Sequence, residues 1–206
     1  MPYLGGQKAD EKVSKGVPVV GSSIAYLQRI DMVKLQSLAE KFDLKIHVQS
    51  LPGTFCTPNR AIALVEQTSR TEELAEECFQ SITECFVLSD TRTFDQDPRF
   101  GLVVLCEIAS RALSPAVNDP GTAIDVIGTL VRLFHQWAGG QQDKAPEVQY
   151  DRIFVPCLAE QDMFDDAFTG IARDGAGAVE VAIRLQKAFD SLSALKYQPV
   201  SGAAIN

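Results

Sequence analysis

The sequence has no run of about 18 uncharged apolar residues, which is the length a helix needs to cross a membrane. Residues 1–16 also lack the apolar centre of a secretory signal peptide. There are only two histidines, and no two of the five cysteines have the CxxC spacing of a zinc or redox site. The chain therefore shows no membrane-spanning segment, no secretory signal and no zinc motif.

Basic residues are also few, since 19 Lys and Arg face 27 Asp and Glu for a net charge of -8. No Lys/Arg run alternates with aromatic residues, so nucleic acid is excluded as a partner. There is no GxSxG motif, and Gly175-Ala-Gly177 lacks the third glycine of a dinucleotide-binding loop. The odd number of cysteines, mostly within apolar patterns, predicts free thiols in a reducing compartment. We expect no cofactor.

Of the 206 residues, 46% are hydrophobic, which is enough to bury a core. Residues 18–69 have the pattern of a small β-rich lobe. A strand ends at Ile30, Asp31 caps a helix that continues to Phe42, and strands follow around 44–48 and 62–64. His47 falls on the polar side of its strand and is predicted to be solvated.

Helical spacing dominates residues 70–198. The pairs Asp97-Pro98 and Asp119-Pro120 predict helices over 98–113 and 120–138, because proline is favoured at the first position of a helix and aspartate before it can cap. A strand is expected over 148–155 and helices over 160–173 and 176–195. The sequence thus predicts an α+β fold, with a small β-rich N-terminal lobe followed by a larger, mainly helical lobe. Residues 1–17 are expected to be a disordered leader or a remnant of an expression vector, and 199–206 a flexible tail.

The segment 91–125 concentrates polar residues around the two Asp-Pro pairs. If the two helix starts lie side by side, their N–H groups and nearby arginines would surround a small cavity suited to an anion. The candidate ligand-binding residues are Arg92, Asp95, Asp97, Arg99, Arg111, Ser114, Asn118, Asp119 and Thr122. We predict no catalytic residue and no metal ligand as the leading interpretation.

The same residues also have a purely structural explanation. Arg111 is expected to pair with Glu107 one helical turn earlier, and short polar side chains such as Ser114 and Asn118 bond backbone groups in turns and caps. A third interpretation uses Asp95, Asp97 and Asp119 as oxygen ligands of Mg²⁺ or Mn²⁺ in a hydrolase.

Four stretches carry a family resemblance: AYLQRID (25–31), LPGTFC (51–56), RTFDQDPRFG (92–101) and RALSPAVNDPGTAID (111–125). Together they resemble a bacterial family of predicted membrane proteins of unknown function, family two-two-five-four, over residues 18–195. Cys56 and Asn59 stand where the family tends to have valine and glycine.

The resemblance implies a parent protein in the bacterial inner membrane, with membrane-spanning helices followed by a soluble region to which this chain corresponds. It implies no activity or cofactor. Together with the free thiols, it predicts a cytoplasmic module that acts in assembly or regulation, not catalysis, and forms a homo-oligomer. The alternatives are an anion or small-molecule sensor and a metal-dependent hydrolase. A sensor should have a concave pocket lined by arginine, whereas an assembly module should pair Arg111 within or between subunits.

Overall fold

The computed structural model describes residues 2–9, 16–68, 75–140 and 147–195. The chain divides into two compact units, of which unit 1 contains residues 1–98 and 146–157, and unit 2 contains residues 99–145 and 158–206. The described strands all belong to unit 1, and the four longest helices make up unit 2. The predicted α+β fold, with its strand-rich N-terminal half, is confirmed. The predicted tail, 199–206, lies outside the described residues.

Unit 1 is built on two β-sheets, one with the strand order β1-β8-β4-β6-β2 and one with the order β5-β3-β7. The strands are β1 (Gly6–Lys8), β2 (Val17–Val20), β3 (Ala25–Ile30), β4 (Leu44–Val48), β5 (Phe55–Cys56), β6 (Ala61–Gln67), β7 (Phe86–Ser89) and β8 (Tyr150–Val155). The last strand, β8, runs parallel to β1 and β4, and β6 pairs antiparallel with β4 and β2. The predicted strands around 24–30, 44–48, 62–64 and 148–155 are confirmed.

Residues 2–8 overturn part of the prediction of a disordered leader. The strand β1 pairs with β8, and the Gln149 N–H donates a hydrogen bond to the Gly5 carbonyl at 2.8 Å. The partner of this segment, β8, lies far away in the sequence, at residues 150–155, so local composition did not reveal it. Residues 10–15 of the expected leader lie outside the described residues.

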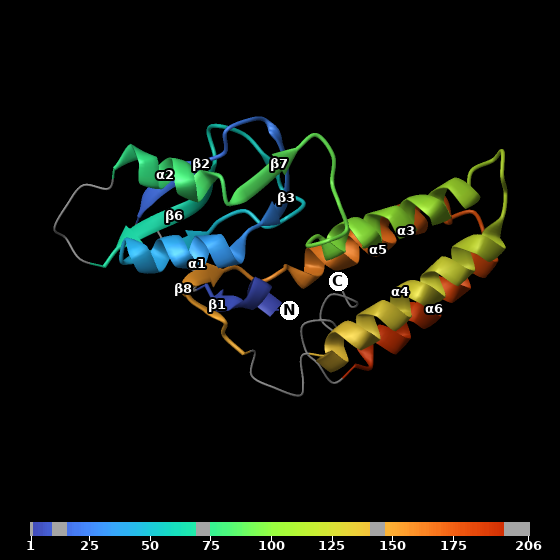
Figure 1. Cartoon of the computed structure of the whole chain (residues 1–206). Helices are drawn as coiled ribbons and strands as arrows, with labels where there is room; N and C mark the ends of the chain where they lie inside the picture. The colour runs from blue at the N-terminus through green and yellow to red at the C-terminus, as the bar shows by residue number, and fades with distance from the viewer. Residues whose placement is uncertain (1, 10–15, 69–74, 141–146, 196–206) are drawn as a thin grey trace. The chain divides into compact units, whose positions relative to one another are not determined.

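Two helices complete unit 1. The first, α1 (Met32–Lys41), begins as predicted, with Oδ1 of Asp31 accepting the Lys34 N–H at 3.0 Å. It packs against β4 and β8, and Leu35 and Ala39 on its inner face are fully buried. The second, α2 (Glu76–Thr83), lies next to β2 and buries Cys78 and Ile82 (Figure 1).

The prediction that His47 is solvated is wrong. His47 is 5% exposed, and its ring stacks on Phe154 of β8 with the centroids 4.7 Å apart. Its Nε2 lies 3.4 Å from Oε2 of Glu66, while Nδ1 has no hydrogen-bond partner among the described residues. The alternation of residues along β4 places His47 and Ile46 on opposite faces of the strand. It could not show that Phe154, on the distant strand β8, packs over His47.

Unit 2 consists of the helices α3 (Pro98–Ala112), α4 (Pro120–Gly140), α5 (Glu160–Asp174) and α6 (Val179–Ser193). They confirm the helices predicted over 98–113, 120–138, 160–173 and 176–195. Figure 1 shows α3 beside α5 and α4 beside α6. Their shared core contains four phenylalanine rings whose neighbouring centroids lie 4.8 to 6.0 Å apart. These are Phe134, Phe164, Phe168 and Phe189.

The almost wholly apolar helix α3 buries only part of its circumference. Its buried residues are Leu102, Cys106, Ala109 and Ala112. Ile108, in contrast, is 47% exposed. One face of α3 therefore packs in the core of unit 2, and apolar surface remains on another face.

Candidate functional site

The two Asp-Pro helix starts do not lie side by side. Asp97 immediately precedes α3, whereas the Asp119 N–H donates a hydrogen bond to the carbonyl of Ala112, the last residue of α3, at 2.8 Å. At a rise of about 1.5 Å per residue, this helix separates the two aspartates by about 22 Å. The expectation of one shared cavity at both helix starts is therefore wrong, because the helices are joined end to end by a short turn.

Asp97 instead forms a buried ion pair with Arg92. The Asp97 carboxylate is 2% exposed and accepts two hydrogen bonds from Arg92, at 2.7 Å from Nε and 3.0 Å from Nη2. It also lies against Gly53, whose φ of +93° suits glycine. A Cβ on Gly53 would overlap the carboxylate, so the predicted Pro52-Gly53 turn and this ion pair depend on each other. Asp95, two residues before Asp97, is exposed.

Arg99 joins α3 to α5. Its Nε donates to Asp166 at 2.6 Å and its Nη1 to Asp162 at 2.8 Å. The hydrogen bond to Asp166, more than the charge of Asp162, raises the pKa of Arg99 above its ordinary value. Arg99 is therefore already engaged by two carboxylates.

The polar residues of the turn between α3 and α4 bond to the backbone or to one another. The Ser114 hydroxyl donates to the Arg111 carbonyl at 2.7 Å, and Asn118 adopts a left-handed φ of 49°. Asp119 caps α4 by accepting the Thr122 N–H at 3.1 Å and the Thr122 hydroxyl at 2.6 Å. The hydrogen bond from the Thr122 side chain, followed by the one from its backbone, lowers the pKa of Asp119. Here the structural explanation offered by the sequence accounts for the geometry.

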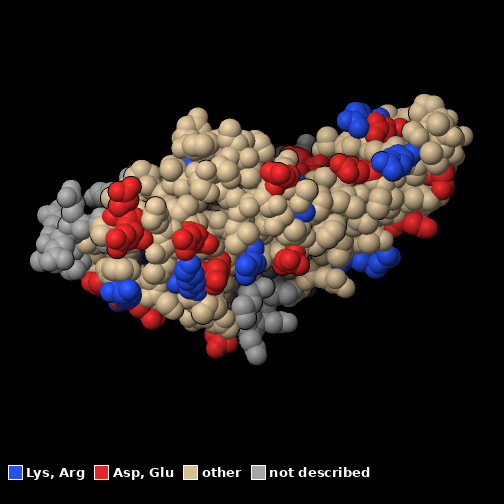
Figure 2. All heavy atoms as spheres, turned by 45° about the horizontal axis from the view of Figure 1, so that its top comes forward, with Lys and Arg blue, Asp and Glu red and all other residues tan. Residues whose placement is uncertain are grey.

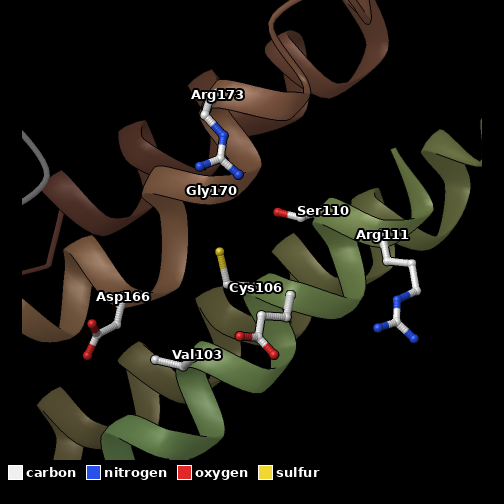
Figure 3. A pocket seen from close by; sticks show the side chains of 8 residues that line it. Val103, Cys106, Ser110, Arg111, Asp166, Gly170 and Arg173 are labelled. Carbon is white, nitrogen blue, oxygen red and sulfur yellow. The ribbon is translucent and has the colours of Figure 1, made fainter. Parts of the chain in front are cut away.

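A groove with a volume of about 530 Å³ runs between α3 and α5. Figure 3 shows Ser110 of α3 and Arg173 of α5 pointing toward it from opposite sides. The residues along it are Val103, Cys106, Glu107, Ser110, Arg111, Asp166, Gly170 and Arg173. Arg173 and then Ser110, both hydrogen-bonded to Asp174, lower the pKa of that carboxyl to about 2.

Gly170 explains how closely α5 approaches α3. A Cβ at this position would meet the Cys106 Sγ at 2.8 Å and the Ser110 Oγ at 3.1 Å. A glycine inside a helical pattern indicates such an approach, but Gly170 was not singled out in the sequence. Cys106 was recognised only as an apolar residue, and Ser110, Asp166 and Arg173 were missed because they lie outside the 91–125 cluster or lack a motif.

Arg111 does not form the predicted pair with Glu107. Neither side chain makes a hydrogen bond or ion pair with any residue that the structure describes, and both are exposed. Figure 3 shows Arg111 pointing away from Arg173 and α5, although its stem borders the groove. The guanidinium is therefore available on the outer side of α3.

Four residues of α3 form a contiguous patch, which we call the outer face of α3. Val104, Glu107, Ile108 and Arg111 are spaced three or four residues apart, so their side chains are neighbours on the helix surface. Val104 is half-buried and the other three are exposed. The outer face thus combines apolar surface with two unpaired charges of opposite sign.

No group of three or more His, Cys, Asp or Glu side chains within the described ranges could hold a metal ion. The three carboxylates proposed for a hydrolase are separated, since Asp119 lies at the far end of α3 from Asp97. On the face shown in Figure 2, basic and acidic side chains of the described residues are interspersed and form no continuous basic surface.

A family model described as "Predicted membrane protein (DUF2254)" matches residues 5–191. An uncharacterised protein of Mycobacterium bovis is 30% identical over 116 residues, which make up 54% of this chain and 22% of that protein. An uncharacterised protein of Mycobacterium tuberculosis strain H37Rv matches with the same identity and coverage. The chain therefore spans about a fifth of the length of these curated relatives. No solved structure matches, and no helix in the described ranges is long and apolar enough to span a bilayer.

Proposed function

Because the chain belongs to the family of predicted membrane proteins designated DUF2254, we propose that it is an assembly module of such a protein. In this proposal two copies associate through the outer face of α3, and the association regulates or stabilises the membrane protein. The observation that carries the proposal is the patch of Val104, Glu107, Ile108 and Arg111, in which apolar surface lies beside unpaired charges.

A two-fold axis through this patch would make it self-complementary. In such an interface residue i of one copy contacts residue j of the other, and j contacts i. Antiparallel packing of two α3 helices would set Glu107 of each copy against Arg111 of the other. The same arrangement would place Ile108 at the centre, between the two charge pairs.

The apolar contact would supply more of the affinity than the charges. Burying the exposed half of an isoleucine side chain contributes about 1 kcal/mol per copy. An exposed ion pair contributes about 0.2 to 1 kcal/mol, so the pairs mainly set the register and orientation of the helices. Arg111 has no intramolecular partner among the described residues, and in this interface it would pair with Glu107 of the other copy.

The cysteines support a cytoplasmic position for the module. All five are free thiols, namely Cys56, Cys78, Cys85, Cys106 and Cys157. Free thiols are typical of a reducing compartment. We place the chain on the cytoplasmic side of a bacterial inner membrane as part of the same proposal.

A charge-reversal cycle tests the interface. Glu107→Arg and Arg111→Glu should each lower the association constant about fivefold or more, because each replaces an attraction with a repulsion. The double variant restores opposite charges and should recover most of the association. Sedimentation velocity over a concentration series measures all three.

Arg184→Glu on α6 is the matched control, because Arg184 is exposed and lies outside the patch. It should leave association unchanged. Equal loss in Arg184→Glu and Arg111→Glu would show a general charge effect, and a double variant no better than the single ones would contradict the pairing.

A second candidate function, anion sensing, is favoured by the groove between α3 and α5. Arg173 and Ser110 point into it, and the Nη1 of Arg173 makes no hydrogen bond to any described residue. If this groove binds anions, inorganic phosphate should raise the melting temperature of the wild type but not that of Arg173→Ala. Arg111→Ala should keep the response, because Arg111 points away; loss of the response in Arg111→Ala alone would contradict this placement.

A further inference from the structure

A second groove lies in unit 1, between the edge strand β2 and the helix α2. The strand β2 is last in its sheet and pairs only with β6 among the described strands. An edge strand leaves a row of backbone N–H and C=O groups on its open side. Two of its valine side chains are also uncovered, since Val17 is 51% exposed and Val20 is 43% exposed, whereas Val19 is buried.

The groove has a volume of about 660 Å³. The strand β2 forms one side and α2 the other, and the half-buried Phe79 of α2 and the exposed Val17 and Val20 of β2 provide its apolar surface. In full it is bordered by Val17, Pro18, Val19, Val20, Ser22, Glu76, Phe79, Gln80, Thr83, Glu84 and Phe86. It is therefore an open groove of mixed polar and apolar lining, bordered on one side by an edge strand.

The charged residues along this groove are acidic. Glu76 and Glu84 border it, and both are exposed. Glu84 forms an ion pair with Lys34 at 3.0 Å, whereas Glu76 forms no ion pair with any residue that the structure describes. Glu76 should therefore attract a cation in the groove more strongly than Glu84, whose charge is already paired with Lys34.

We propose that this groove binds an extended peptide in which aliphatic and basic side chains alternate. A peptide that adds to an open sheet edge gains affinity from its backbone, and alternate side chains point to the same side. Its aliphatic side chains would lie against Phe79, Val17 and Val20, and a lysine or arginine would meet Glu76. Pro18 has no N–H to offer, so the backbone contacts come from its carbonyl and from the neighbouring residues.

Charge favours such a peptide over a second copy of the same edge. A second copy that paired through β2 would bring its own acidic border, with Glu76, and no cation from its strand VPVV to oppose that charge. A basic peptide neutralises that border instead.

The test uses the whole chain and a fluorescein-labelled heptapeptide, Lys-Val-Lys-Val-Lys-Val-Lys, titrated by fluorescence anisotropy. The peptide should bind saturably and slow amide hydrogen exchange in β2. Glu76→Lys should weaken binding about tenfold. Glu77→Lys is the matched control, since Glu77 is exposed on the same helix but does not border the groove, and it should change affinity by less than about twofold.

Two companion peptides separate specific binding from attraction to an acidic protein. Replacing valine by serine should abolish binding, and replacing lysine by glutamate should do the same. The proposal is overturned if the serine peptide binds as tightly, or if Glu76→Lys and Glu77→Lys weaken binding equally. It is also overturned if the chain self-associates through β2, shown by peptide competing with dimer formation; a dimer formed through α3 leaves it standing.

Discussion

The two units of this chain differ in the kinds of side chain that they bury. All four buried polar residues that the structure describes, Gln36, His47, Ser50 and Asp97, belong to unit 1. Unit 2 fills its core with apolar side chains, including the four-phenylalanine cluster. The two units also differ in the kind of element they join, because unit 1 pairs strands that lie far apart in the sequence, such as β1 and β8, whereas unit 2 packs helices against one another.

Polar contacts give unit 1 the specificity that its topology requires. The Gln36 side chain on α1 donates to Asp151 Oδ1 at 2.6 Å and accepts the Arg152 N–H at 3.2 Å, which ties the helix to β8. Arg152 in turn bonds Asp43 at 2.7 Å, directly before β4. Apolar packing tolerates small shifts between helices, but a strand displaced by one residue turns every side chain to the other face. The comparison teaches that polar groups are concentrated where register must be fixed.

Phe168→Ala should have the largest effect on stability and should act on unit 2. Phe168 is 2% exposed and contacts three other aromatic rings, so its truncation should cost about 4 kcal/mol. Trp137, the single tryptophan, lies on α4 of unit 2 and reports its unfolding in urea by fluorescence. Ile183→Ala, at a 52% exposed position of α6, is the control and should change little. Similar losses in both variants would contradict the assigned core.

Asp97→Ala should be the next largest effect and should act on unit 1. Removing one partner of a buried ion pair costs about 3 to 5 kcal/mol, and the lower figure applies because the Arg92 side chain is 22% exposed. Exposed Asp95 provides the control, since Asp95→Ala should stay within about 0.5 kcal/mol of the wild type. Urea denaturation followed by circular dichroism measures both. If Asp97→Ala and Asp95→Ala lower the free energy of unfolding equally, buried polar contacts do not stabilise unit 1 as this comparison requires.

Gly170→Ala should destabilise unit 2 by about 1 to 3 kcal/mol, because its methyl group must displace Cys106 or Ser110. Gly128→Ala, on α4, should instead be neutral or stabilising by up to about 1 kcal/mol, since only the end of the Arg132 side chain lies near and alanine favours the helix. Thermal unfolding compares the two. A stabilised Gly170→Ala would show that α3 and α5 are not closely packed there.

The smallest effect concerns the cap of α4. The pKa of Asp119 is lowered in the folded chain, so the carboxylate adds stability above its ordinary pKa and loses it as the pH falls through the folded-state value. Asp119→Ala should therefore unfold earlier than the wild type at neutral pH, and the difference should vanish in acid. A difference that is constant with pH would exclude the carboxylate as its cause.

Local features of the chain could be predicted from the sequence because their causes are local. Asp31 caps α1, and Pro98 and Pro120 begin α3 and α4, as their residue types indicate. The cap formed by Asp119 and the backbone bond made by Ser114 follow from the same reasoning.

Features that depend on distant partners could not be predicted in this way. The strand β8 was recognised, but its position between β1 and β4 depends on pairing across most of the sequence. His47 has a polar neighbour pattern, yet Phe154 covers it. The proposed meeting of Asp97 and Asp119 was wrong because the helix between them, α3, holds its two ends about 22 Å apart.

Static light scattering of the wild-type chain at micromolar concentration tests the central claim most directly. Association through the outer face of α3 predicts a mass of twice 22.4 kDa, and Ile108→Asp should return it to that of a single chain. A wild-type chain that remains at 22.4 kDa, or a dimer unaffected by Ile108→Asp, would contradict the account.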